Sequence, residues 1–195
     1  YAATADRELQ NIAFIKQQMA RKSLSAYNIN KDNGLNAEGG SYAPVWIDDK
    51  NIWFTSTRPQ GEDKAKNTNN RIYQSEFSGG KATGPVAVDI AQPKDMQQGV
   101  AAISPDGNTI YITRWDIAKN KKNASIFMSK KVNGKWGDPV PATALEAAGS
   151  NTQQPFIMPD GKTLLFSSDR TGGFGGFDIW MAPIDGNGNV GTPVN

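Results

Sequence analysis

A repeat with a period of 54 residues constrains the fold of this chain more than any other feature of its sequence. Three Pro-Val pairs mark the period, with prolines at 85, 139 and 193, so that 54 residues separate each from the next. Stretches in which apolar residues flank a tight turn recur at 44–58, 102–115 and 155–170. A further apolar pair follows each stretch, at Ile72-Tyr73, Ile126-Phe127 and Ile179-Trp180. Equal spacing of independent landmarks indicates one structural unit used three times.

Each unit contains four short strands in sequence. We expect them at 43–47, 51–56, 71–77 and 84–88, then at 100–104, 109–114, 124–131 and 136–141, and finally at 154–158, 163–168, 177–183 and 190–194. A four-stranded antiparallel sheet that recurs at a fixed period is typical of a β-propeller blade. Stacking between neighbours buries the two faces that a lone blade would leave wet. The sequence therefore predicts an all-β propeller with three visible blades, at about 43–89, 99–143 and 154–195.

The turns between the first and second strands agree with this prediction. Residues 105–108 and 159–162 both begin Pro-Asp-Gly, which supplies a fixed φ, a side chain that bonds nearby amides, and a positive φ. The first unit has Asp48-Asp49-Lys50-Asn51 instead and is one residue shorter, so its turn should differ. Because Asp48, Asp106 and Asp160 recur at equivalent turns, we interpret them as structural rather than as acid/base groups.

The composition excludes several classes of function. The chain contains no His and no Cys, which excludes disulfides, thiolate zinc sites and catalysis by either residue. A net charge of +2 gives no electrostatic footprint for nucleic acid or anionic lipid, and no apolar run approaches the about 20 residues that span a bilayer. We therefore predict no cofactor, no metal, no nucleic-acid partner, no transmembrane segment and no catalytic residue. Two-carboxylate chemistry needs no His, so a propeller glycoside hydrolase, with carboxylates partly outside this chain, stays as the alternative.

Two glycine-rich segments could be mistaken for ligand sites. Residues 172–176 lack the following helix that a phosphate-binding loop needs, and we expect Asp178 to hydrogen-bond the amides of this loop instead. Residues 185–189 resemble the start of a calcium loop, but Val190 stands where that loop needs Gly. A turn between strands is the better interpretation of this segment.

The loops between second and third strands are the candidate binding region. They span 55–71, 113–124 and 167–177, and in a propeller they emerge on one side of the sheets, where a rigid scaffold presents them. The predicted contact residues are Arg58, Arg114, Trp115, Asp116, Asp169, Arg170 and Phe174. For Arg58 and Arg170, which lie at equivalent positions, structural ion pairs with neighbouring blades are an equal alternative.

The second and third units also carry a family resemblance. Residues 104–112 and 159–170 resemble the Pro-Asp-Gly variant of WD-like propeller repeats, which is found in TolB-type envelope proteins. Residues 171–180 are similar to the repeat of OmpA-family, PorE-type envelope proteins of Bacteroidota. The resemblance covers about residues 25–195 and implies a periplasmic, outer-membrane-associated protein that is not an enzyme. Its implied role is a scaffold that binds other envelope proteins in a peptidoglycan-linked assembly, such as that of type IX secretion.

The two ends of the chain leave further alternatives open. Leu9, Ile12, Ile15 and Met19 predict one amphipathic helix over 4–22. It either packs on the side of the propeller or, as the resemblance implies, is the last helix of a tetratricopeptide-type domain (residues 1–23, with the propeller over 24–195). Residues 24–30 have the place of an outer strand. Because three blades fall short of the roughly 4–8 of closed propellers, we expect further blades beyond Asn195 or from a partner chain.

Overall fold

The computed structural model describes residues 2–21, 34–59, 69–116 and 124–195, and these form two units, 1–31 and 32–195. The first unit holds the predicted helix, α1 (Ala2–Ala20). Within the described residues, no helix combines the length and the apolarity that a membrane crossing requires. The strand expected at 24–30, and residues 60–68 and 117–123 of the candidate loops, lie outside the described residues.

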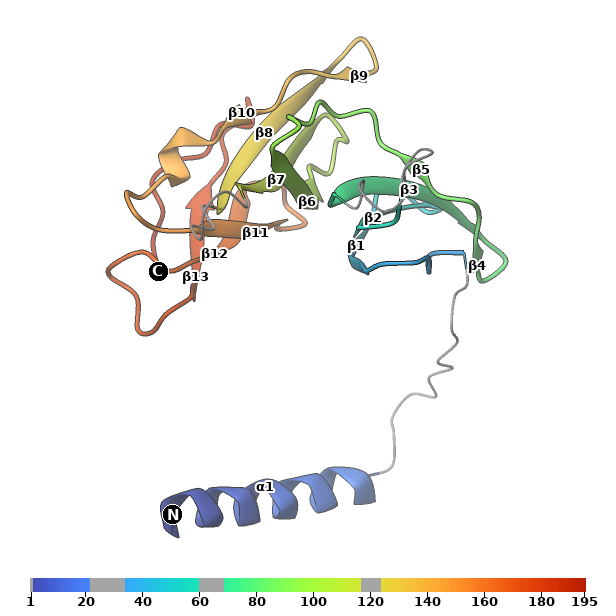
Figure 1. Ribbon diagram of the computed structural model, residues 1–195. Helices are drawn as coiled ribbons and strands as arrows, with labels where there is room; N and C mark the ends of the chain where they lie inside the picture. The colour runs from blue at the N-terminus through green and yellow to red at the C-terminus, as the bar shows by residue number, and fades with distance from the viewer. Residues whose placement is uncertain (1, 22–33, 60–68, 117–123) are drawn as a thin grey trace. The chain divides into compact units, whose positions relative to one another are not determined.

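The second unit consists of three antiparallel sheets that follow one another in chain order (Figure 1). Sheet 1 comprises β1 (Ser41–Trp46), β2 (Asn51–Ser56), β3 (Arg71–Ser78), β4 (Lys81–Ala82) and β5 (Val86–Ala87). Sheet 2 comprises β6 (Met96–Ile103), β7 (Thr109–Asp116), β8 (Ala124–Val132), β9 (Lys135–Trp136) and β10 (Val140–Pro141). Sheet 3 comprises β11 (Thr152–Ile157), β12 (Thr163–Ser168) and β13 (Asp178–Pro183).

The three sheets share one four-stranded plan. In sheets 1 and 2 the fourth position belongs to β5 and β10, which pair with the third strand, and in sheet 3 the Met181–Val194 bridge takes this place. β4 and β9 are short additions that form a hairpin on the third strand, where sheet 3 has the Ile184–Val190 bridge. The predicted fold class, antiparallel four-stranded repeats with one N-terminal helix, is therefore confirmed.

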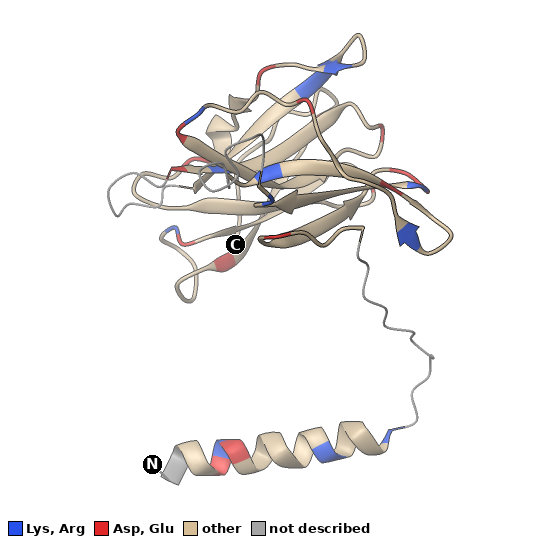
Figure 2. Ribbon diagram, turned by 45° about the vertical axis from the view of Figure 1, so that its right-hand side comes forward, with Lys and Arg blue, Asp and Glu red and all other residues tan. Residues whose placement is uncertain are grey.

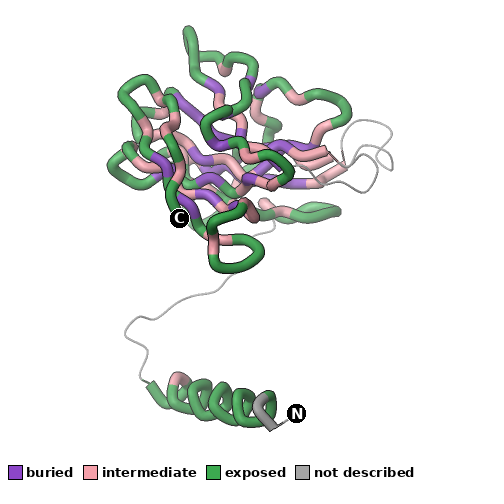
Figure 3. The backbone as a smooth tube through the Cα atoms, turned by 90° about the vertical axis from the view of Figure 1, so that its left-hand side faces the viewer, coloured by how far each residue is buried: buried purple, intermediate pink, exposed green. Residues whose placement is uncertain are grey.

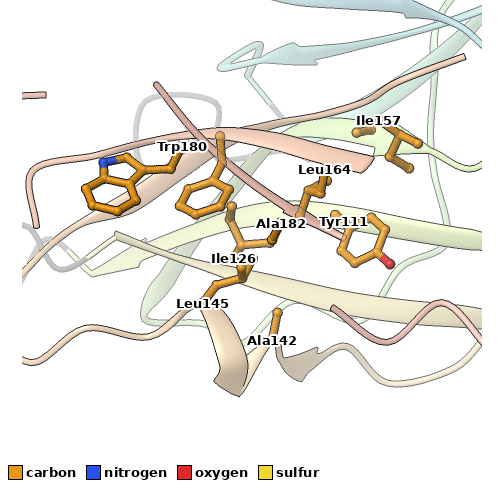
Figure 4. Packing of buried hydrophobic residues seen from close by; sticks show 10 residues of the cluster. Tyr111, Ile126, Ala142, Leu145, Ile157, Leu164, Trp180 and Ala182 are labelled. Atoms are coloured by element: carbon orange, nitrogen blue, oxygen red, sulfur yellow. The ribbon is translucent and has the colours of Figure 1, made fainter. Parts of the chain in front are cut away.

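Two apolar cores lie between the sheets, as stacked blades require. Between sheets 1 and 2 the core contains Trp53, Ile72, Ile90, Ile110 and Ile112. Between sheets 2 and 3 it contains Tyr111, Ile126, Leu164, Phe166 and Trp180, with Ala142 and Leu145 from the connector that includes a 3-10 turn at Thr143–Leu145 (Figure 4). Buried segments accordingly run along the middle strands, whereas the turns are exposed (Figure 3). β7, the second strand of sheet 2, contributes Ile110 and Ile112 to one core and Tyr111 to the other, which is why it is nearly continuously apolar.

The turn aspartates have the structural role that the sequence indicates. Asp48 Oδ1 accepts the amides of Lys50 and Asn51, Asp106 Oδ1 accepts the amide of Asn108, and Asp160 Oδ1 accepts that of Lys162. The first turn is one residue tighter, as predicted: it closes with Ile47 N–H on Asn51 O, whereas the second closes with Ser104 N–H on Thr109 O. Asp185 likewise accepts the amides of Asn187 and Asn189, which confirms the turn at 185–189.

A bulge in the first strand of each sheet was not foreseen from the sequence. Ala43, Val100 and Gln154 have φ values of 51°, 50° and 57°, in the left-handed region that non-glycine residues rarely adopt. Val100 N–H donates to Thr55 Oγ1 of sheet 1 at 2.8 Å, and Gln154 N–H donates to Thr113 Oγ1 of sheet 2 at 3.0 Å. The bulge therefore turns a backbone donor toward the preceding sheet and fixes the register of the two sheets.

Candidate binding surface

The seven predicted contact residues all lie where a second strand ends or in the loop that follows it. We call this side of the sheets the loop face. Arg58 follows β2, while Arg114, Trp115 and Asp116 end β7. Asp169, Arg170 and Phe174 lie between β12 and β13. Lys, Arg, Asp and Glu are interspersed along the second unit rather than gathered by sign (Figure 2).

Arg58 contacts neutral groups of its own sheet and of the segment before it. Its Nη2 donates to Leu35 O at 2.9 Å, and its Nε donates to Ser56 Oγ at 3.2 Å. The guanidinium carbon lies 5.0 Å from the ring centre of Phe54 and 4.7 Å from that of Tyr73. Burial lowers the pKa of Arg58 from its usual value. The side chain thus ties the segment before β1 to the middle of sheet 1.

Arg170 repeats this arrangement in sheet 3. Its Nη2 donates to Leu145 O at 2.5 Å and to Thr152 Oγ1 at 3.0 Å, and its Nε donates to Ser168 Oγ at 2.9 Å. The guanidinium lies over Phe166 and Trp180, with centroid distances of 5.0 and 5.2 Å. Burial lowers the pKa of Arg170 as well.

Arg114 makes equivalent contacts in sheet 2, although it stands two residues earlier in the repeat than Arg58 and Arg170. Its Nη2 donates to Ala91 O, its Nε donates to Gln98 Oε1 at 2.8 Å, and its guanidinium lies 4.8 Å from the ring centre of Phe127. All three arginines therefore clamp the connector that leads into their own sheet. Among the described residues, the groups that the guanidiniums of Arg58 and Arg170 contact are carbonyls, hydroxyls and rings, and the ion pairs offered as the alternative stay a prediction.

Asp169 also has a partner within the fold. Its two carboxylate oxygens accept Asn151 N–H at 2.5 Å and Asn151 Nδ2 at 2.8 Å. Burial opposes the ionisation of Asp169, but these hydrogen bonds outweigh it and lower the pKa. Asn151 in turn accepts the amide of Ala124, at the start of β8, so Asp169 secures a contact between sheets 2 and 3. Trp115 and Asp116, both half-buried, pair with Gln97 and Met96 of β6.

Phe174 differs from the other six residues because it is 98% exposed. The loop that carries it is nevertheless pinned: Asp178 Oδ2 accepts Phe174 N–H at 2.7 Å and Gly175 N–H at 3.1 Å, as the sequence predicts. A Cβ at Gly173 would collide with the Asp178 carboxylate, which explains the glycine at this position. The loop therefore presents an aromatic ring to solvent on a fixed backbone.

A groove of about 470 Å³ between sheets 2 and 3 brings three carboxylates to one space. Asp106, Asp160 and Asp185 line it together with Lys130. The hydroxyl of Ser104 and the amide of Asn108 lower the pKa of Asp106, and hydrogen bonds from Asn189 lower that of Asp185. A glycosidase pair needs one carboxyl group that keeps its proton near neutral pH, and these shifts have the opposite sign. Among the described residues, however, no three such side chains are arranged so that they could hold a metal ion together.

No protein-family model matches the sequence, and neither does any curated protein. Among solved structures, TolB from Acinetobacter baumannii is 24% identical with a TM-score of 0.49, over 81% of this chain and 33% of TolB. A puromycin-hydrolyzing peptidase of Mycobacterium tuberculosis is 15% identical with a TM-score of 0.46, over 83% of this chain and 33% of the peptidase. A TolB-like protein from Agrobacterium tumefaciens is 18% identical with a TM-score of 0.38, over 82% and 63%. The chain thus spans about a third of the length of the first two proteins.

Proposed function

We propose that this chain is a non-catalytic binding module, in which a rigid series of propeller-type sheets holds protein partners through the loop face. The observation that carries the proposal is Phe174, almost fully exposed on a loop that Asp178 fixes. An aromatic side chain on an ordered backbone contributes contact area at little cost in entropy, which favours protein interfaces. The arginine clamps support the same view, since they make the scaffold behind the loop rigid.

The finer role that we propose is that of a scaffold in the periplasm, associated with the outer membrane and with other envelope proteins. It is supported by the similarity of residues 171–180 to the repeat of OmpA-family envelope proteins. On this proposal the module works in a peptidoglycan-linked assembly of the type IX secretion kind. The lowered pKa values of Asp106 and Asp185 make both groups poor proton donors to a leaving oxygen, so the glycosidase alternative would need its acid from another residue.

A photo-crosslinking residue at position 174, in the protein expressed in its own cell envelope, tests the proposal. We expect a discrete set of protein adducts at position 174 and few at Asn187, an exposed residue in the hairpin at the other end of β13. Phe174→Ala should abolish co-purification of the crosslinked partner. It should change the free energy of unfolding by no more than about 0.5 kcal/mol, since the side chain is exposed. Equal adduct patterns at both positions, or partner binding unchanged by Phe174→Ala, would contradict the proposal.

A further inference from the structure

Each sheet has two different faces, which we name by the direction in which the chain proceeds. The leading face is turned toward the preceding sheet and the trailing face toward the next one. In sheet 1 the trailing face carries Trp53, Thr55 and Ile72, which are buried against Ile110 and Ile112 of the leading face of sheet 2. In this pair, the trailing face of one sheet is covered by the leading face of the next.

Sheet 2 repeats the contact. Its trailing face carries Tyr111, Thr113 and Ile126, all buried under the leading face of sheet 3, where Leu164 and Phe166 lie. The threonine is at the same register in both sheets and accepts a bulge amide of the next sheet: Val100 in one case and Gln154 in the other. A trailing face is therefore recognised by an apolar surface together with one hydroxyl acceptor at its centre.

Sheet 3 has a trailing face of the same design, and it is open. Strand pairing places Leu165, Ser167 and Ile179 at the positions of Tyr111, Thr113 and Ile126 in sheet 2. Ile179 is 73% exposed, whereas its counterpart Ile126 is 1% exposed. Phe156, Met181 and Val194 extend the same face and are about half exposed, at 55%, 48% and 50%. A contiguous apolar patch of this kind marks an interaction surface.

We propose that the trailing face of sheet 3 is a docking surface for one further sheet of this repeat. The occupant presents an apolar leading face to Phe156, Ile179 and Met181, and a bulge N–H to Ser167 Oγ. The repeat itself argues for a sheet rather than a single peptide strand, because each of the two covered trailing faces is covered by a whole sheet that carries this donor. The proposal does not depend on the binding role of Phe174.

The leading face of sheet 1 in a second copy of this chain is a poorer occupant. Ile52, Phe54 and Tyr73 form the middle of that face and are already buried, at 6%, 2% and 4% exposure. They could not cover another sheet without first losing what covers them. Self-association is therefore a distinct outcome that the test must recognise.

The absence of cysteine from the chain allows a single thiol to report on this surface. The test uses Ile179→Cys in the full chain and in an extended chain that carries a second copy of residues 142–195 after Asn195. We expect the thiol to react with a disulfide reagent at least about tenfold more slowly in the extended chain, since the appended sheet must open before reaction. Asn187→Cys, in an exposed hairpin, is the matched control and should react equally fast in both chains.

A variant of the extended chain separates docking from mere proximity. Phe166→Asp in the appended copy alone places a charge in the leading face and should restore the fast reaction of the thiol at 179. Equal reaction rates in the two parent chains would refute the proposal, whether or not the appended sheet is folded, because residues 142–195 already fold on the trailing face of sheet 2. Slow reaction in the unextended chain that depends on protein concentration would also refute it, in favour of a second copy as the occupant.

Discussion

Replacing Arg170 with alanine tests whether the guanidinium clamps hold the connectors to their sheets. The substitution removes the hydrogen bond to Leu145 O, although Thr152 Oγ1 still donates to that carbonyl at 3.2 Å. The carbonyl thus keeps one of its two hydrogen bonds. We expect the loss of the other to lower the free energy of unfolding by about 1 kcal/mol. Loss of the contacts with Phe166 and Trp180, at 5.0 and 5.2 Å, adds roughly 0.5 kcal/mol each for a half-exposed cation. We expect Arg170→Ala to lower the free energy of unfolding by about 2 kcal/mol.

Urea unfolding followed by tryptophan fluorescence measures this loss. With a slope of about 2 kcal/mol per molar urea, the midpoint should fall by about 1 M. Arg170→Lys keeps the charge but not the fork of donors, so it should lose part of this stability. Lys162→Ala, which removes an exposed charge from the same sheet, should leave the midpoint nearly unchanged. If Arg170→Ala unfolds at the same urea concentration as Lys162→Ala, the clamp does not stabilise the fold. The role predicted from the sequence, contact with a partner, would then be the better explanation of Arg170.

Three further changes test other parts of the structure. Thr113→Val should lower the free energy of unfolding by about 1–3 kcal/mol, because it leaves the amide of Gln154 unpaired between two sheets, and Thr113→Ser should restore most of it in urea titrations. Gly173→Ala should speed hydrogen exchange of the loop amides that the carboxylate holds. Gly176→Ala, with open space around its Cβ, should not. Burial raises the pKa of Tyr111 to about 12, so unfolding releases a proton between pH 10 and 12. Stability should fall through that range by about 2–3 kcal/mol, a slope that Tyr111→Phe removes in unfolding measured at pH 9 and 11.5.

The strands and turns could be predicted because their signals are local. A short apolar run after a turn aspartate places β2 at Asn51–Ser56 and β12 at Thr163–Ser168, at the boundaries expected from sequence. The bond from Asp178 to the loop amides was predictable for the same reason, since donor and acceptor lie within four residues of each other. Such signals depend only on neighbours along the chain.

The clamps could not be predicted in the same way. Arg58 and Arg170 stand at equivalent positions, which the repeat makes visible, and this is why a structural role could be suggested for them. Their partners are the backbone carbonyls of Leu35 and Leu145, and a carbonyl has no side-chain identity that a sequence could show. Ion pairs were one of two equal alternatives for these arginines, whereas the described contacts use the fork of donors and the flat face of the guanidinium.

The bulges show how a contact between sheets overrides local preference. Ala43, Val100 and Gln154 share no side-chain property that favours a left-handed backbone, which costs roughly 1–2 kcal/mol per residue. At Val100 and Gln154 the cost is offset by a hydrogen bond that exists only when the preceding sheet is in place. The sequence therefore shows the bulge only through its hydrogen-bond acceptor, a hydroxyl residue at one register of each second strand. Ser167 has that hydroxyl in sheet 3, at the register where we propose that a further sheet donates its bulge amide.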